Sequence, residues 1–255
     1  MPQSVDRALD VLDAVAASDG PVPAKALARR LGCGLSTVYD LLGSLTARGH
    51  LVRTASGYAL GYRVPALHDA FRRQMRVTDG LQDLLAEARR AAGADTYFST
   101  YRDGDIAVLA GAATGHPATG GFTTGLDDTA HATAHGKMLL AALPPAARQR
   151  YLTAYGMRAI TPRTVTSPAR LDAQLRQVRR QGLAVEIEEC APGVACVAVP
   201  VPSGATGGAP AAVSAALPLE DFRQRGPQVT EELRRVAAEA AKFRKTADIT
   251  GPTAG

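Results

Sequence analysis

Along the first 50 residues, apolar side chains recur at intervals of three and four, which is the pattern of amphipathic helices. The spacing predicts helices over Val5–Ala17 with Ser4 as N-cap, over Ala24–Leu31, and over Leu35–Leu45. The three residues Gly32–Gly34 leave room only for a tight turn between the second and third helices. Two short helices joined by a glycine-bearing turn are typical of a helix-turn-helix, in which the second helix lies in a DNA major groove.

Two short strands are expected directly after the third helix. His50–Arg53 and Tyr58–Leu60 flank the turn Thr54–Gly57, which predicts a β-hairpin. Three helices and a hairpin form a winged helix-turn-helix, and a basic wing residue such as Arg53 is suited to a backbone phosphate. Apolar residues at helical spacing then predict a linker helix over Tyr62–Arg76.

The rest of the chain mixes the period of helices with the period of strands. Helices are expected over Thr78–Ala92, Thr133–Leu140, Pro145–Tyr155, Pro168–Gln181 and Glu220–Arg244. Strands are expected over Asp95–Tyr101, Ile106–Ala110, Leu183–Glu188, Val194–Val201 and Ala211–Leu217. Gly111–Asp128 is rich in Gly and Thr and is expected to be a loop that could include one strand. This order predicts an α+β domain built on an antiparallel sheet.

The pattern divides the chain into four parts. Residues 1–61 form the winged helix-turn-helix, 62–77 the linker helix, 78–248 the α+β domain and 249–255 a flexible tail. Residues 1–76 carry 10 Lys and Arg against 6 Asp and Glu, whereas the remainder carries 19 against 18. Most of the net charge of +5 therefore lies in the part that would approach phosphates.

Composition restricts the class of protein further. No apolar run reaches the ~18 residues that span a bilayer, and the N-terminus lacks a basic-then-apolar export signal. The cysteines Cys33, Cys190 and Cys196 are odd in number and lack zinc-site spacing. A cytoplasmic protein with reduced thiols and no membrane association is therefore expected.

Six stretches carry a resemblance over nearly the whole chain. They are Arg7–Val15, Ala26–Leu45, Gly57–Gly61, His131–Leu143, Thr161–Pro168 and Gly182–Val201. In this order and spacing the chain resembles the IclR family of bacterial transcriptional regulators. The resemblance implies an N-terminal winged helix, a linker helix and a C-terminal GAF-like domain that binds a small effector. It also implies a homodimer or dimer of dimers on palindromic operator DNA, repressing or activating, without cofactor or enzymatic activity.

The candidate DNA contacts lie on the two helices of the helix-turn-helix and on the wing. They are Lys25, Arg29, Ser36, Thr37, Tyr39, Asp40 and Arg53. Hydroxyls and N–H groups at a helix start suit phosphate contact, although Ser36 could instead serve only as an N-cap. The family usually carries a basic residue where Asp40 stands. A carboxylate cannot bind phosphate, but it can accept a hydrogen bond from the cytosine amino group.

The resemblance also implies an effector site on the C-terminal domain. Its candidate residues are Ala134, His135, Gly136, Glu186, Cys196 and Ser214. The backbone at Ala134 and His135 would cap an anionic group, so that an organic acid is one candidate effector. Two departures from the family pattern, Ala216 in place of Ser and His135 in place of a small residue, indicate a different effector from the small keto or hydroxy acids of some relatives. Alternatively, Cys196 and Ser214 only pack in a buried strand.

Other functions remain open from the sequence. The C-terminal domain could only oligomerise, or it could be a metal-sensing or enzymatic domain that uses His131, His135 and Cys196. The two histidines have the i, i+4 spacing of metal ligands on one helix face, but no HExxH glutamate lies between them. Glu188 and Glu189 are expected to be a solvated pair at a strand end.

Overall fold

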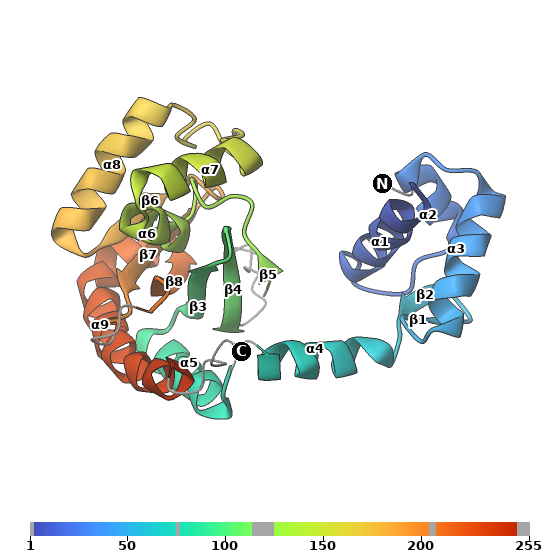
Figure 1. Ribbon diagram of the computed structural model, residues 1–255, viewed down its shortest axis with the longest axis horizontal. Coiled ribbons are helices and arrows are strands. Elements are labelled where there is room, and N and C mark those ends of the chain that lie inside the picture. Colours follow the sequence, from blue (N-terminus) through green and yellow to red (C-terminus); the bar gives the residue numbers. More distant parts are fainter. Residues whose placement is uncertain (1–2, 75–76, 114–124, 204–207, 249–255) are drawn as a thin grey trace, which may run out of the picture. The chain divides into compact units, whose positions relative to one another are not determined.

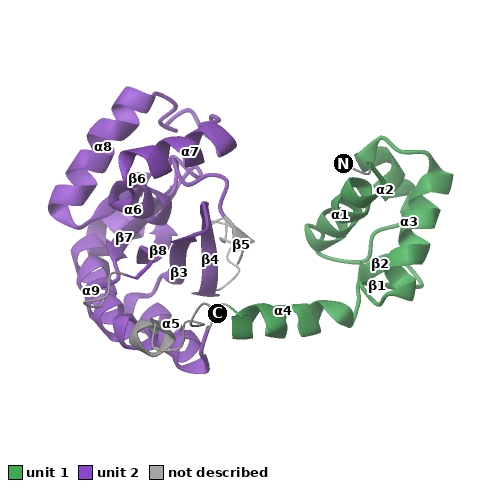
Figure 2. Cartoon of the chain, viewed as in Figure 1, with its two compact units in different colours: residues 1–74 green, residues 75–255 purple. Residues whose placement is uncertain are grey.

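The computed structural model describes residues 3–74, 77–113, 125–203 and 208–248. The chain divides into two compact units, unit 1 over Met1–Gln74 and unit 2 over Met75–Gly255, coloured separately in Figure 2. Each unit has its own hydrophobic core.

Unit 1 contains the expected helices and hairpin (Figure 1). Its elements are α1 (Gln3–Ala16), α2 (Ala24–Leu31), α3 (Leu35–Ala47), β1 (Leu51–Thr54), β2 (Gly57–Leu60) and α4 (Arg63–Gln74). The first three helices enclose a core in which Val11, Leu27 and Leu42 are fully buried. Leu27 and Leu42 lie on the apolar faces that the spacing predicts for α2 and α3. On α1 the buried residues are Val11, Ala14 and Val15, whereas Val5 and Leu9 are exposed.

The hairpin is joined to the helices through a glycine. β1 and β2 pair antiparallel from Leu51 opposite Leu60 to Thr54 opposite Gly57, and Tyr58 forms a bridge with Val22. Gly57 has φ +148°, and a Cβ there would lie 2.5 Å from the carbonyl carbon of Val22. Only glycine permits this close approach of the hairpin to the segment before α2.

The predicted N-cap of the first helix differs from the structure, and the turn between α2 and α3 has no side-chain cap. Ser4 lies inside α1, which begins at Gln3, so its prediction as N-cap is wrong. α3 has Gly34 as its N-cap with no side-chain cap, and α2 ends at Gly32 in the left-handed conformation. The turn between α2 and α3 therefore depends on glycine backbone geometry rather than on side-chain capping.

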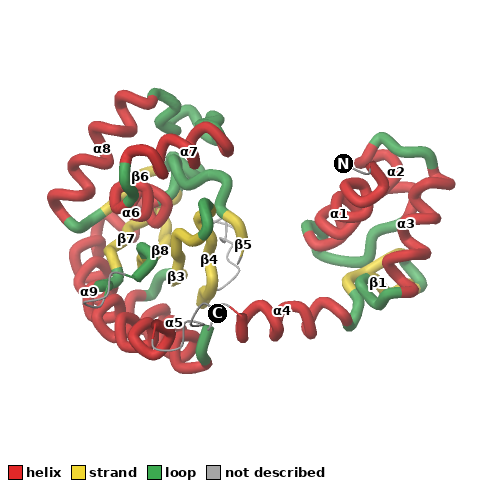
Figure 3. The backbone as a smooth tube through the Cα atoms, viewed as in Figure 1, coloured by secondary structure: helices red, strands yellow, loops and turns green. Residues whose placement is uncertain are grey.

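Unit 2 combines helices with a sheet (Figure 3), and the neighbouring strands of this sheet pair antiparallel. Its helices are α5 (Asp79–Ala92), α6 (Ala134–Ala142), α7 (Pro145–Tyr155), α8 (Pro168–Gln181) and α9 (Leu219–Asp248). Its strands are β3 (Asp95–Arg102), β4 (Asp105–Ala112), β5 (Gly125–Leu126), β6 (Ala184–Ile187), β7 (Val194–Pro200) and β8 (Ala211–Pro218). The strand order is β5-β4-β3-β8-β7-β6, which confirms the predicted fold class.

Helices cover both faces of this sheet. α5 and α9 pack on one face, where Phe98 and Val197 lie in their cluster, and α6 packs on the other with α8 against it. The second face carries Tyr97, Cys196 and Ala216. Alternate residues of one strand thus enter different cores, which explains why the buried strands read as continuous apolar runs.

Three predictions concern segments that lie partly or wholly outside the described residues or at the C-terminal end. Within the expected loop Gly111–Asp128, residues 114–124 lie outside the described residues, and Gly125–Leu126 forms a short strand. The last helix extends to Asp248, past its expected end at Arg244. The expected flexible tail, 249–255, lies outside the described residues. Among the helices that the structure describes, none combines the length and apolarity needed to cross a bilayer.

Candidate functional site

The first candidate surface is the outward face of α3. Val38, Leu42 and Leu45 are buried against the helical core of unit 1. Tyr39 lies away from them with half of its side chain exposed, and Asp40 is exposed beside it. A helix with an open polar face next to a firmly packed apolar face is suited to enter a groove without unfolding.

The start of α3 leaves its polar groups available. Because Gly34 provides the N-cap without a side chain, Ser36 does not cap this helix, and that alternative for Ser36 is wrong. Ser36 is exposed and Thr37 is half-buried in the first turn. The first N–H groups of a helix and its positive dipole end attract anions such as DNA phosphates.

The basic candidates of unit 1 are also at its surface. Lys25 and Arg29 are exposed on α2, one helical turn apart, and Arg53 is exposed on β1 of the hairpin. The structure therefore presents all seven candidate DNA contacts at least partly to solvent within one compact unit.

The second candidate site lies in unit 2, on the sheet face beneath α6. Glu186 of β6 is opposite Cys196 of β7, and Ser214 of β8 is opposite Ala198 two residues further along β7. Because alternate residues share a face, these three side chains point to the side on which α6 packs. Ala134, His135 and Gly136 form the first turn of α6 and are buried.

Glu186 is the most unusual of these residues, since its side chain is buried with 1% exposure. Its Oε2 atom accepts hydrogen bonds from the backbone N–H groups of Glu189 (2.8 Å) and Cys190 (3.4 Å). Its Oε1 atom has no hydrogen-bond partner among the described residues, and the same is true of the buried Ser214 hydroxyl. Burial raises the pKa of Glu186, although the neighbouring Cys196 thiol and the hydrogen bonds from the two N–H groups oppose the rise. Buried polar atoms without partners are rare and indicate a place where a ligand or water binds.

His135 is directed to a different partner. Its Nε2 atom lies 2.9 Å from Oδ2 of the buried Asp127. Thr133 caps α6 by accepting from the Gly136 N–H at 3.1 Å and donates to the same Asp127 oxygen. Asp127 was not among the candidates, although an Asp two residues before Thr129 is the sequence signal of an Asx turn.

The surroundings of Asp127 predict a pH dependence of stability. Burial raises its pKa, but the hydrogen bond and charge of His135 and the hydrogen bonds from Thr129 outweigh burial and lower the pKa from 3.8 to about 2. The carboxylate thus contributes about 2 kcal/mol that is present above pH ~4 and lost as the pH falls through about 2. We expect the stability difference between the native protein and Asp127→Asn to shrink over this range in denaturant unfolding. A difference that stays constant down to pH 2 would contradict this account.

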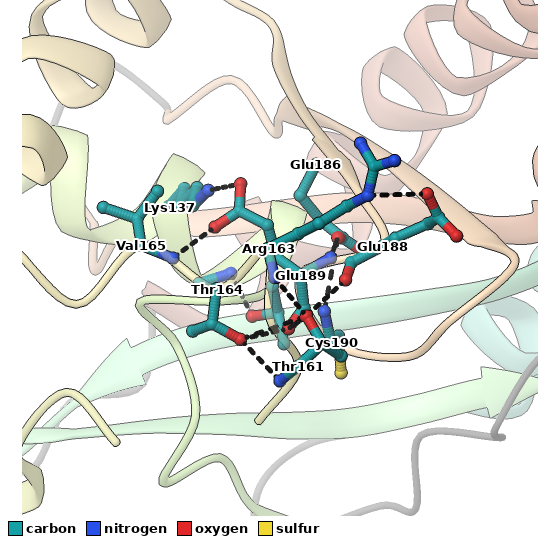
Figure 4. Close-up of polar contacts among 11 residues, drawn as sticks. Lys137, Thr161, Arg163, Thr164, Val165, Glu186, Glu188, Glu189 and Cys190 are labelled. Carbon is teal, nitrogen blue, oxygen red and sulfur yellow. Dashed lines mark hydrogen bonds and ion pairs between the residues drawn. The ribbon is translucent and has the colours of Figure 1, made fainter. Parts of the chain in front are cut away.

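A network of polar contacts ties α6 to the turn between β6 and β7 (Figure 4). Lys137 forms an ion pair with Glu189, and both side chains are buried. The other carboxylate oxygen of Glu189 accepts from the N–H of Val165 at 3.2 Å. The expectation of a solvated pair is therefore wrong for Glu189, whereas Glu188 is partly exposed and pairs with Arg163 at 2.9 Å.

The stretch Thr161–Pro168 closes this network. The Thr161 hydroxyl donates to the Glu188 carbonyl at 2.6 Å, and the Thr164 hydroxyl donates to the Glu189 carbonyl at 2.7 Å. At both positions a short side-chain hydroxyl reaches a backbone carbonyl of the turn after β6. This stretch therefore has a structural role next to the candidate effector site.

The histidine pair does not have the geometry of a metal site on one helix. His131 lies in the turn before α6, and its Nε2 atom lies 2.9 Å from the carbonyl oxygen of Arg158. His135 faces Asp127. Within the described ranges, no group of three or more His, Cys, Asp or Glu side chains is placed to hold a metal ion.

A winged helix-turn-helix followed by an α+β domain with a buried polar site defines a class of one-component transcription factors. Comparison with known families gives the same result. Residues 4–55 match the IclR helix-turn-helix domain, and residues 73–242 match the bacterial transcriptional regulator IclR C-terminal domain. The chain belongs to the IclR family and is a DNA-binding transcriptional regulator of that type.

Individual relatives agree with this assignment. The HTH-type transcriptional regulator BhcR of Paracoccus denitrificans is 31% identical over 201 residues, which cover 78% of this chain and 72% of that protein. A transcriptional regulator of Rhodococcus has a similar structure, with a TM-score of 0.74 at 25% identity over 97% of this chain and 100% of that one. An IclR homologue of Microbacterium hydrocarbonoxydans, crystallised with 4-hydroxybenzoate, shares the fold with a TM-score of 0.73 at 21% identity, over 96% and 100% of the two chains.

Proposed function

We propose that this regulator is a cytoplasmic homodimer, or a dimer of dimers, that binds palindromic operator DNA under the control of a small effector. In this proposal residues 1–61 bind DNA, residues 62–77 form the linker helix, and residues 78–248 bind the effector and oligomerise. The protein catalyses no reaction in this proposal and needs no cofactor. The observation that carries it is the pairing of an open DNA-facing helix in unit 1 with a buried polar site in unit 2.

The DNA contacts in this proposal are the surface groups of unit 1. Tyr39 and Thr37 contact the groove from α3, together with Ser36 and Asp40, while Lys25, Arg29 and Arg53 contact phosphates. Support comes from the exposure of these side chains beside a packed helical core. Phosphate contacts give affinity, and contacts to base edges give sequence preference.

Dimer formation is supported by apolar groups that unit 1 leaves in solvent. Val5 and Leu9, one turn apart on α1, are 54% and 55% exposed. α4 carries Val64, Leu67 and Phe71 at helical spacing, yet none of its described residues is buried. A 12-residue helix is marginal by itself in water, so an apolar face of this kind favours contact with a second copy.

The effector site in this proposal is formed by the first turn of α6 and the strands beneath it. Glu186 and Ser214 carry buried oxygen atoms without partners among the described residues, and the α6 N-terminus provides backbone donors. An IclR homologue of the same fold has been crystallised with 4-hydroxybenzoate. An organic acid is therefore a reasonable effector class for the first screen.

The function is tested with the full-length protein and the DNA upstream of its own gene. We expect specific binding of this DNA, and a raised melting temperature with the effector, because a ligand of the native state stabilises it. If the same compound releases the DNA or tightens its binding, effector binding in unit 2 is coupled to DNA binding in unit 1. Absence of sequence-preferring DNA binding would overturn the proposed function.

Thr37→Ala and Tyr39→Ala are each expected to weaken operator affinity about tenfold, because each removes a contact from an exposed helix face without opening the core. Fluorescence anisotropy with labelled operator measures the effect, and circular dichroism checks the fold. Thr153→Ala, an exposed threonine in unit 2, is the control and is expected to bind normally. If both α3 variants bind as tightly as the native protein, this placement of the DNA contacts is wrong.

A further inference from the structure

Gly43 lies in the middle of α3, where neither the packing nor the backbone conformation requires glycine. Gly43 is exposed in α3, and a Cβ built there would meet nothing within 4 Å. Its φ lies outside the left-handed region, so the backbone does not require glycine either. Glycine in a helix interior lowers stability relative to alanine. A glycine that the fold does not need is expected where another molecule approaches the backbone closely.

Gly43 is part of a defined line on the helix surface. Ser36, Asp40 and Gly43 follow each other at intervals of four and three residues, so they lie one above the other. All three are exposed, on the side opposite the buried Val38 and Leu42. This line is therefore the outermost edge of α3 and the part that would reach deepest into a groove.

Asp40 is a second unusual feature of the same line. Asp40 is the only charged residue of α3, and it is exposed. Its negative charge is repelled by DNA phosphates, so the side chain costs affinity for every sequence. A group of this kind contributes to recognition through discrimination between bases, because it favours one edge and rejects others.

We propose that Gly43 lets a base pair come against the backbone of α3 and that Asp40, one turn away, accepts a hydrogen bond from a cytosine amino group there. The proposal rests on the proposed operator contact by α3. In the major groove, guanine and thymine present acceptors, which a carboxylate rejects, whereas cytosine presents the N4 amino donor. Adenine places the N7 acceptor beside its amino group, so cytosine is the preferred partner of an acceptor-only side chain.

The base preference is tested by selection from randomised DNA with the full-length protein. We expect cytosine at one position in each half-site for the native protein and a preference reduced about tenfold for Asp40→Ala. Asp40→Asn is expected to shift this position toward adenine, since an amide pairs with the N6 and N7 edge. Binding of non-specific DNA is expected to stay equal or to become tighter in both variants. The control Asp19→Asn removes the same charge from an exposed turn of unit 1 and is expected to keep the cytosine.

The close approach is tested at Gly43. Gly43→Ala is expected to keep or raise the melting temperature, yet to weaken operator affinity about tenfold, and Gly43→Gln is expected to weaken it further. The control is Gly20→Ala, at an exposed position where a Cβ also meets nothing within 4 Å, and it is expected to bind normally.

The outcomes separate this inference from the proposed function. If the native protein selects an operator and Asp40→Ala selects the same bases, the role of Asp40 is overturned. If Gly43→Gln binds the operator as tightly as the native protein, the close approach is overturned. If the native protein selects no sequence at all, the proposed function fails and the inference fails with it.

Discussion

Replacement of Lys137 by methionine is expected to lower the free energy of unfolding of unit 2 by about 3–5 kcal/mol, the cost of removing one partner of a buried ion pair. Lys137 and Glu189 are both buried, so the remaining carboxylate would lose its charge partner away from water. The Glu189 carboxylate would keep only its hydrogen bond from the Val165 N–H. Denaturant unfolding of the full-length protein measures the change.

Two further variants make this prediction specific. Lys137→Met combined with Glu189→Gln is expected to recover part of the loss, since the neutral amide leaves no buried charge. Lys242→Met, which removes an exposed partner of Glu239, is the control and is expected to change stability by less than about 1 kcal/mol. A loss at Lys137 no larger than at Lys242 would show that the buried pair contributes little.

Leu9→Glu is expected to weaken the association of two copies through α1 and to lower operator affinity by about a hundredfold. The side chain is 55% exposed on α1, so glutamate is accommodated in the monomer but places a charge in the proposed contact between two copies. A palindromic site is bound more tightly by two half-site contacts that are linked, and DNA-binding units that no longer contact each other lose part of this linkage. Analytical ultracentrifugation and operator titration measure the two effects.

The matched control for this variant is Gln3→Glu, which adds the same charge at another exposed position of α1. We expect this control to remain dimeric and to bind the operator. If Leu9→Glu associates and binds the operator as the native protein does, α1 has no part in the contact between the copies.

The sequence predicted those elements whose stabilising contacts repeat at short intervals. α7 and α8 begin and end where the apolar and proline pattern places them, at Pro145–Tyr155 and Pro168–Gln181. The N-cap predicted at Ser4 was wrong, and the N-cap at Gly34 was not predicted. A cap depends on backbone geometry that residue type alone does not determine.

Contacts between distant segments could not be predicted in the same way. Lys137 and Glu189 are 52 positions apart, and nothing in either helix or strand pattern indicates that they meet. Asp127 likewise becomes part of the candidate site only through His135 of the following helix. The family resemblance named Glu186 and Cys196 as candidates on strands. The structure has them opposite each other on β6 and β7, and the resemblance carried no information on which oxygen of Glu186 is occupied.

The two carboxylate oxygens of Glu186 differ in their contacts, and this difference has a consequence for how a bound molecule could affect the backbone. Oε2 accepts hydrogen bonds from the backbone of the turn after β6, while Oε1 is buried without a hydrogen-bond partner among the described residues. A molecule that donated a hydrogen bond to Oε1 would share the negative charge of the carboxylate with the turn, so the hydrogen bonds from the turn to Oε2 would become weaker. The carbonyl of Glu189 in that turn is in turn held by Thr164. One carboxyl group can therefore couple the binding of a molecule to the backbone of this turn, without any hinge or large movement of the sheet.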